Sequence, residues 1–191
     1  METLQIPYYI ALGNHDNSAE GRSLMTSQYG GSYYTFKKDS NQFIFLNTEN
    51  NEYEPSIDQI VFLESTSAKN IFLFTHKLMW VNHTPLKEVQ FDNHGKEYFK
   101  NIFWKKLFPV LVNTNKDVYC IAGDVAGEEK TIPASYEKTG NVRLISSGIG
   151  NAENENVLVI STEKNFVDIK AILLKNGKFI EVTDFLIEKS D

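Results

Sequence analysis

The tetrapeptide Gly13-Asn14-His15-Asp16 brings an amide, an imidazole and a carboxylate together directly after an apolar run. Asn14 offers an oxygen to a metal ion or an NH2 group to a phosphate. His15 can bind a metal ion or donate a proton, and Asp16 can fix the tautomer of that histidine. Loops at the carboxyl ends of sheet strands hold the sites of many α/β proteins, which favours a functional role. An ordinary polar turn accounts for the tetrapeptide alone equally well.

Two further polar residues follow apolar runs later in the chain. His76 comes after the run 71–74, and Asp124 comes after the run 118–122. A histidine at a strand end is well placed to bind a metal ion, and an aspartate supplies an oxygen ligand. Taken singly, a histidine satisfied by the backbone and a turn aspartate are the commoner explanations. Three strand ends that carry such residues in order are harder to explain as turns, which favours a shared site.

The elements that must position these residues indicate an α/β fold. The apolar run from Tyr8 to Leu12 predicts a buried strand, because strands buried on both faces are continuously apolar. A capping-box spacing at 56–59 predicts a helix after it, and apolar residues spaced along 99–107 predict a second helix, which Pro109 ends or restarts. A hairpin with a longer turn is predicted from 33–36 and 43–46. Further strands are predicted at 71–74, 118–122, 142–146, 157–160, 166–174 and 179–187.

Strand–helix alternation followed by consecutive strands predicts two packed β-sheets with helices outside. The chain of 191 residues is 41% hydrophobic and 23% charged, and its polar interruptions are short, so one domain over 1–191 is expected. Cys120 is the only cysteine, which excludes an intrachain disulfide.

The charge and the apolar runs of the chain also limit which classes of partner are expected. A net charge of -6 argues against a nucleic-acid-binding surface, which normally carries a basic excess. An anionic substrate would therefore be held locally, most simply by a metal ion. No run approaches the roughly 20 apolar residues of a membrane-spanning helix, and the first five residues lack the pattern of a signal peptide.

The order of these motifs resembles the back half of the calcineurin-like metallophosphoesterases. Strand-Gly-Asn-His-Asp, a strand ending at His76, a strand followed by Gly123-Asp124, and strands opened by Ser146-Ser147-Gly148-Ile149-Gly150 occur in that order. The segments 33–36 and 43–47 resemble the hairpin after the family's Gly-Asn-His motif, and 74–80 resembles its histidine strand. The resemblance covers most of the chain and implies a four-layer α/β fold of two packed sheets flanked by helices.

The resemblance also implies roles for individual residues. Family members hydrolyse phosphate esters with two divalent metal ions, such as Mn, Zn or Fe. By this likeness Asn14 and His76 are ligands of the second metal ion, and Asn14 also contacts phosphate. His15 would stabilise the phosphoryl oxygens or protonate the leaving group, with Asp16 orienting it.

The chain departs from the family pattern at three motifs. Asp-x-His and Gly-Asp, which should precede Gly13, are absent from the twelve residues before it. Asp124 and Ala126 stand where the family's Gly-His-x-His motif has its histidines; the aspartate can bind a metal ion and the alanine cannot. We therefore expect no complete two-metal centre in this chain, and at most one weak metal site from Asn14, His76 and Asp124.

Two explanations fit these departures. The chain is the larger piece of a phosphoesterase whose reading frame was truncated, or it is a relative that has lost chemistry and keeps the fold for binding or as a scaffold. Either way, strands that should lie beside Tyr8 to Leu12 are expected to be missing. That would leave an unpaired apolar edge, and self-association through this N-terminal edge strand is expected.

Overall fold

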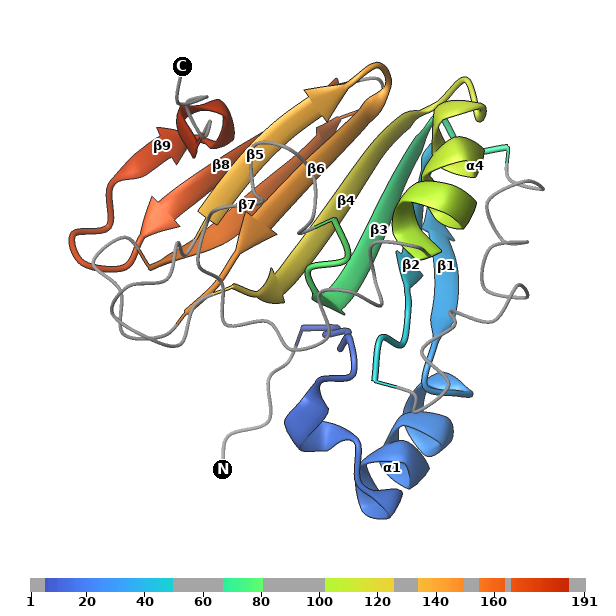
Figure 1. Ribbon diagram of the computed structural model, residues 1–191. Helices are drawn as coiled ribbons and strands as arrows, with labels where there is room; N and C mark the ends of the chain where they lie inside the picture. The colour runs from blue at the N-terminus through green and yellow to red at the C-terminus, as the bar shows by residue number, and fades with distance from the viewer. Residues whose placement is uncertain are drawn as a thin grey trace.

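A computed structural model shows a mixed α/β architecture with two β-sheets (Figure 1). It describes residues 6–49, 67–80, 102–125, 134–149, 155–163 and 166–185. The predicted helix after 56–59 and the start of the one predicted over 99–107 lie outside these ranges. The described helices are too short or too polar to span a membrane. The prediction of an α/β fold with two β-sheets is confirmed.

Sheet A has six strands in the order β1-β2-β3-β4-β6-β5. Strands β2, β3, β4 and β6 run parallel, and β1 and β5 are antiparallel strands at the two edges. The carboxyl ends of the four parallel strands therefore share one edge, which is the lower edge in Figure 1. The strands are β1 (Tyr34–Lys38), β2 (Asn41–Phe45), β3 (Asn70–Lys77), β4 (Asp117–Asp124), β5 (Ala134–Thr139) and β6 (Val142–Ser147).

The β1–β2 hairpin confirms the predicted pairing but not the predicted turn. Lys38 pairs with Asn41, so the turn contains only Asp39 and Ser40. Asp39 has a φ of 55°, a left-handed conformation that aspartate tolerates better than most residues. The polar run 37–42 was expected to be loop, yet most of it lies in the strands. Polar composition was misleading because β1 is an edge strand whose lysines face solvent.

Sheet B has three antiparallel strands, β7 (Asn156–Glu163), β8 (Phe166–Leu173) and β9 (Phe179–Glu181), in that order. The strand predicted over 179–187 is too long. After Glu181 the chain forms a 3-10 turn, η3 (Val182–Phe185), and Val182 is buried among the residues between the sheets. Packing of this side chain has thus overridden the local strand preference.

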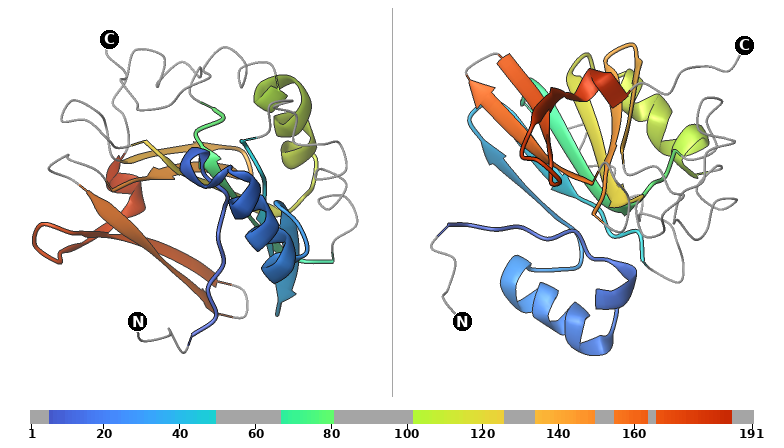
Figure 2. Two further views of the ribbon diagram at one scale, coloured as in Figure 1. Left: turned by 90° about the horizontal axis from the view of Figure 1, so that it is seen from below. Right: turned by 90° about the vertical axis from the view of Figure 1, so that its left-hand side faces the viewer.

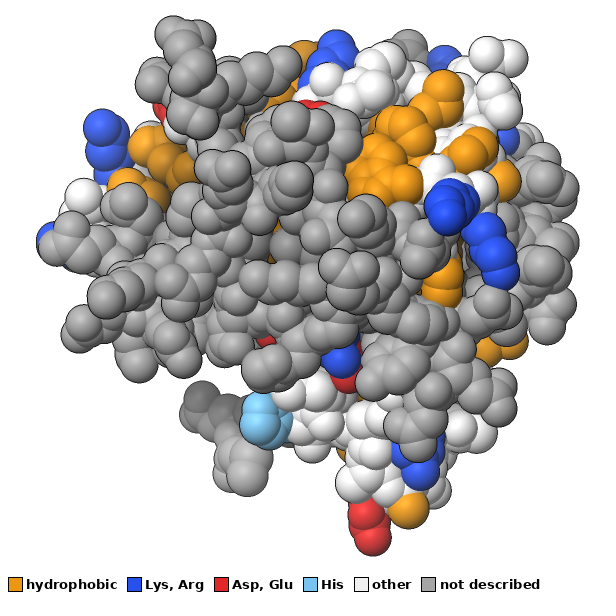
Figure 3. All heavy atoms as spheres, viewed as in Figure 1, with side chains coloured by type: hydrophobic (Ala, Val, Ile, Leu, Met, Phe, Trp, Pro, Cys, Tyr) orange, Lys and Arg blue, Asp and Glu red, His pale blue; other side chains and the backbone are white. Residues whose placement is uncertain are grey.

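The two faces of sheet A are covered differently (Figure 2). One face carries a π-helical turn, η2 (Phe103–Leu107), that continues into α4 (Phe108–Val112). Pro109 lies in the first turn of α4, where its missing N–H group costs no hydrogen bond, so it restarts the helix. Apolar side chains also reach the surface over α4 (Figure 3), and they include Val112. Sheet B packs on the other face.

Two hydrophobic cores result. The helix-side core lies between sheet A and the η2–α4 segment and contains Ile44, Leu46, Ile71, Leu73, Leu78, Met79, Trp80, Phe103, Leu107, Leu111, Val118, Cys120, Ala122, Val125, Val142 and Leu144. The inter-sheet core lies between sheets A and B. Its buried members are Phe72, Tyr119, Ile121, Ile145, Ile169 and Val182, and its partly buried members are Phe43, Phe74, Tyr136, Leu158, Ile160, Val167 and Phe185.

The predicted buried strand from Tyr8 to Leu12 is wrong. These residues form no strand, and Tyr8 and Tyr9 are 51% and 46% exposed. A continuous apolar strand is stable only with neighbours on both sides, and no described strand pairs with this segment. The hydroxyl of Tyr34 instead accepts from the backbone N–H of Ile10 and donates to its carbonyl, both at 2.8 Å. The expected N-terminal edge strand is therefore an extended apolar segment.

Two elements were not predicted from the sequence. Helix α1 (Ala19–Tyr29) projects from the lower edge in Figure 1, with Ser18 accepting a hydrogen bond from Gly21 N–H at its start and Gly30 ending it at a φ of 81°. Only Met25 of this helix is buried, so its sequence needs few apolar residues and shows no clear apolar pattern. Strand β5 escaped prediction because four of its six residues, Ser135, Glu137, Lys138 and Thr139, are polar or charged, as an edge position permits.

Candidate functional site

The candidate site lies at the edge where the parallel strands of sheet A end. His76 is near the end of β3 and Asp124 ends β4, one strand away. A short 3-10 helix, η1 (Asn14–Asp16), lies beside them and follows Gly13, whose carbonyl accepts from the N–H of Asp16. The strand-end rule thus located the site correctly, although His76 and Asp124 lie within their strands rather than after them.

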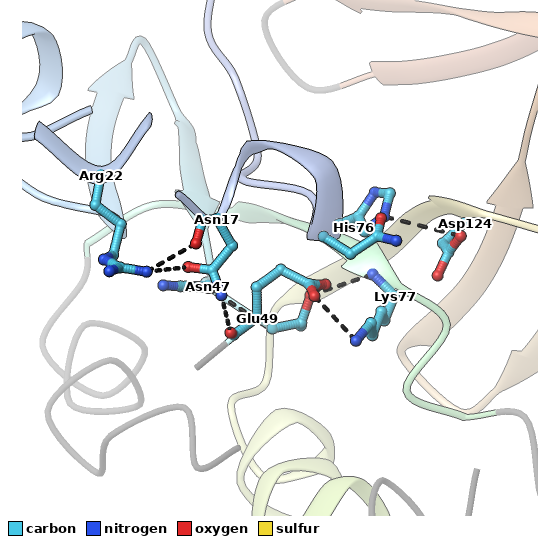
Figure 4. A network of polar contacts seen from close by, with 9 residues as sticks. Asn17, Arg22, Asn47, Glu49, His76, Lys77 and Asp124 are labelled. Carbon is cyan, nitrogen blue, oxygen red and sulfur yellow. Dashed lines mark hydrogen bonds and ion pairs between the residues drawn. The ribbon is translucent and has the colours of Figure 1, made fainter. Parts of the chain in front are cut away.

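The predicted metal ligands Asn14, His76 and Asp124 converge. His76 Nε2 is 2.9 Å from Asn14 Oδ1 and 3.8 Å from Asp124 Oδ1. The His76 and Asp124 side chains are 25% and 17% exposed, so this side of the site is open to solvent. Figure 4 shows the two side chains directed toward each other from neighbouring strands. Asn14 and His76 are 62 positions apart in the sequence, and the fold brings their side chains into contact.

The spacing of these donor atoms fits a shared cation. Metal–nitrogen and metal–oxygen bonds are about 2.0–2.2 Å long, so two ligand atoms of one ion lie at most about 4.3 Å apart. Both separations from His76 Nε2, 2.9 and 3.8 Å, are below that limit. Among the described residues, no three His, Cys, Asp or Glu side chains form a metal-binding group. The third donor here is the amide of Asn14, which makes a weak site.

Gly13 allows this close arrangement. A Cβ atom on Gly13 would lie 3.2 Å from Asp16 Oδ2, 3.2 Å from His76 Cε1 and 3.3 Å from His76 Nδ1. These distances are tighter than ordinary contacts, so a side chain here would displace the imidazole or the carboxylate. An alanine here would thus require a shift of a few tenths of an ångström in one of these two side chains.

The predicted catalytic pair is placed differently from the metal ligands. His15 is exposed on η1, and the described contacts include no hydrogen bond between it and Asp16. The Asp16 carboxylate lies on the Gly13 side, near the His76 ring. Asp16 and His76, one of the predicted metal ligands, thus both approach Gly13, and orientation of His15 by Asp16 stays a prediction.

A buried ion pair beside the site was not predicted from the sequence. Lys77 Nζ is 2.9 Å from Glu49 Oε2, with side chains only 9% and 4% exposed (Figure 4). The backbone N–H of Lys77 donates to Thr48 Oγ1 at 3.2 Å, which ties the end of β3 to the segment after β2. Asn47, Thr48 and Glu49 come shortly after β2, at the same edge of the sheet. The same strand-end rule, applied to the run 43–46, could have identified them.

This ion pair connects to the start of α1. Asn17 Nδ2 donates to the Glu49 carbonyl, and Arg22 donates to the Asn17 carbonyl at 2.8 Å and to Asn17 Oδ1 at 3.0 Å (Figure 4). The bond from Asn17 to the Glu49 carbonyl anchors the η1–α1 connection to the segment after β2, and Arg22 holds Asn17 in place from α1. The network therefore supports the position of Asn14 above His76.

A cleft of about 790 Å³ opens next to the site on the sheet-B side. Its lining includes Thr75 and Gly123, the sequence neighbours of His76 and Asp124, and otherwise consists mostly of apolar and aromatic side chains. Tyr9 stacks on Phe36 across part of it, with ring centroids 4.2 Å apart. This volume is in the range of ligand-sized cavities.

No protein-family model matches the chain, and the search of curated proteins found no match.

Proposed function

We propose that this chain is a metallophosphoesterase-like domain of the four-layer type, and that Asn14, His76 and Asp124 hold one divalent cation. In the complete enzyme this site would serve metal-dependent hydrolysis of phosphate esters, and the chain alone would have negligible turnover. The single observation that carries the proposal is the convergence of three predicted donors, from separate segments, within 3.8 Å of His76 Nε2.

The chemistry of the donor set supports the proposal. An imidazole, a carboxylate and an amide oxygen suit Mn or Zn. A bound divalent cation would supply Lewis acidity toward a phosphoryl oxygen. The protein groups would position the substrate: the NH2 group of Asn14 can donate to a phosphate oxygen, and the exposed imidazole of His15 can donate a proton to the leaving-group oxygen.

A second function, a non-catalytic binding or scaffold domain, is favoured by the small number of donors. Asp124 is the only carboxylate with a contact to His76 among the described ion pairs, and tight divalent sites use more charged ligands. In this alternative the domain has the same fold but does not hydrolyse phosphate esters.

Cation titration tests the proposal. We expect one Mn²⁺ per chain, bound weakly, in electron paramagnetic resonance titrations, and at least a tenfold weaker affinity in His76→Ala. His15→Ala is the matched control, because that histidine lies on η1 beside Asn14 but outside the proposed ligand set, and it should retain binding. Two tightly held ions per chain, or equal affinity in His76→Ala, would contradict the proposal.

Activity assays separate the two functions. The isolated chain with Mn²⁺ or Zn²⁺ is expected to hydrolyse a chromogenic phosphate ester no faster than metal alone. Turnover that is lost in His15→Ala would show that the chain itself is a phosphoesterase. Cation binding without turnover in a longer form of the protein would instead favour the binding domain.

A further inference from the structure

His76 stands on the same face of sheet A as the aromatic floor of the cleft. Phe72 and Phe74 of β3 belong to the inter-sheet core. Successive side chains of a strand point to opposite faces, so His76, two residues after Phe74, continues this row. Two strand positions span about 7 Å. A phosphate bound to a cation at His76 would therefore lie next to the ring of Phe74, which lines the cleft.

A glycine on β4 leaves the way from the site into the cleft open. Lys77 pairs with Asp124 in the parallel register of β3 and β4, so the preceding residue, Gly123, lies level with His76. Gly123 lines the cleft. A Cβ atom on it would have one described atom within 4 Å, the carbonyl oxygen of Ser147 at 3.8 Å. The cleft thus reaches the candidate site through open space at this glycine.

The floor of the cleft presents the edges of aromatic rings. The rings of Phe45 and Phe74 are 4.8 Å apart at an interplanar angle of 16°, and those of Tyr34 and Phe45 are 4.7 Å apart at 9°. Rings in one plane would collide at these separations, which equal the strand spacing, so the rings stand upright and face one another. Their edges point into the cleft. Ring edges carry partial positive charge and attract the negative face of another aromatic ring.

The part of the cleft nearest the site is uncharged. Lys38 is the one charged residue among the described lining. It pairs with Asn41, and Asn41 pairs with Asn70. Asn70 comes six positions before His76 on β3, a separation of about 20 Å along the strand. A charged group on the organic part of a ligand would therefore lie on apolar rings without a counter-charge, which is unfavourable.

Two hydroxyl groups of the lining already donate within the protein. Thr75 Oγ1 donates to the carbonyl of Lys77 at 3.0 Å, and Ser147 Oγ donates to Asn156 Oδ1 at 2.9 Å. A sugar or nucleoside would bury several hydroxyl groups here and would compete with these bonds for partners. The lining therefore favours an aromatic group with few polar atoms.

We propose that the substrate of this site is a phosphate ester of an uncharged aromatic alcohol, whose ring lies on Phe45 and Phe74 while its phosphate binds the cation at His76. The phosphate half of this proposal rests on the proposed function. Hydrolysis bonds the oxygen of one water molecule to phosphorus and breaks the bond from phosphorus to the alcohol oxygen, which takes up a proton. The products are phosphate and the aromatic alcohol.

The probe is 2-naphthylmethylphosphonate, whose carbon–phosphorus bond resists hydrolysis and whose two fused rings can cover both phenylalanines. Isothermal titration calorimetry on the full chain with Mn²⁺ measures its affinity. We expect it to bind at least tenfold more tightly than methylphosphonate, which has no apolar group to bury. It should bind at least twofold more tightly than its fully hydrogenated analogue, which lacks a π-face. An affinity no higher than that of either control would overturn the proposal.

Variants test the location of the ring. Ala11→Trp places a large side chain in the lining and should weaken binding of the naphthyl probe at least fivefold, without changing the affinity for Mn²⁺ or methylphosphonate. Ala19→Trp, on the exposed start of α1, should change none of these. Phe74→Leu keeps the floor apolar but removes a ring edge, so it should abolish the preference for the naphthyl probe over its hydrogenated analogue. Equal naphthyl affinity in the two Trp variants would overturn the proposal.

Failure of this proposal is distinguishable from failure of the proposed function, because Mn²⁺ is titrated first, without phosphonate. A chain that binds Mn²⁺ but does not prefer the naphthyl probe contradicts only the aromatic substrate. A chain that binds no Mn²⁺ contradicts the proposed function and, with it, the ester assigned here, even if 2-naphthylmethanol binds in the cleft.

Discussion

The helix-side core and the inter-sheet core share sheet A but differ in completeness. On the helix side the buried core members from Phe103 to Val118 are fully buried, and the partly buried Trp104, Phe108 and Val110 pack against them. Between the sheets, half-buried side chains such as Phe43 and Phe74 border an open cleft. The candidate site lies at the end of this open side. Because most of the fully buried side chains lie on the helix side, we expect that side to contribute more to the stability of this domain.

Truncating one phenylalanine in each core tests this comparison most strongly. Phe103→Ala should lower the free energy of unfolding by about 3–5 kcal/mol, because it leaves a closed cavity. Phe43→Ala should cost only about 1–2 kcal/mol, because its side chain is partly buried and borders the cleft. Urea denaturation of both variants measures the difference. Equal losses would mean that the two cores contribute alike.

The buried ion pair below the site tests how the edge of sheet A is held. Lys77→Met should cost about 3–5 kcal/mol, because it leaves the Glu49 carboxylate buried without its cation. The double variant Lys77→Met with Glu49→Leu should recover most of that loss, since no unpaired charge remains. Denaturation of the single and double variants gives the comparison. A double variant no more stable than the single one would show that the pair has a further structural role.

Gly13→Ala tests the close approach at the site itself. The added methyl group would displace the His76 ring, so Mn²⁺ affinity should fall roughly tenfold with little change in stability. Gly31→Ala is a matched control, because its Cβ would lie 3.4 Å from Tyr33 O and 4.0 Å from Tyr33 N, away from the candidate site. Unchanged affinity in Gly13→Ala would show that the imidazole does not bind the cation.

The smallest effect is expected at Tyr34, which holds the N-terminal segment at the cleft. Burial raises the pKa of its hydroxyl from 10.0 to about 12. A raised folded-state pKa contributes stability that is fully present below pH 10 and is lost as the pH rises through 12. The urea midpoint of the wild type should therefore fall over this range relative to that of Tyr34→Phe. Parallel pH profiles for the two proteins would contradict this.

The sequence indicated every strand of sheet A except β5, and it fixed the order of the site residues. Continuous apolar runs such as 71–74 and 118–122 favour buried strands, and parallel strands bring their carboxyl ends to one edge. That is sufficient to predict that His76 and Asp124 are neighbours. The hairpin pairing at 34–45 followed from the same patterns.

Only the tertiary structure decided which apolar segments find partners. Tyr8 to Leu12 is an apolar run, yet it forms no strand and only Leu12 is buried, because a strand also needs neighbours that its own sequence does not specify. The 2.9 Å contact between His76 and Asn14 and the burial of Glu49 with Lys77 likewise depend on how loops cross the sheet edge. Local patterns fix which residues prefer burial, but the packing of distant segments decides which of them achieve it.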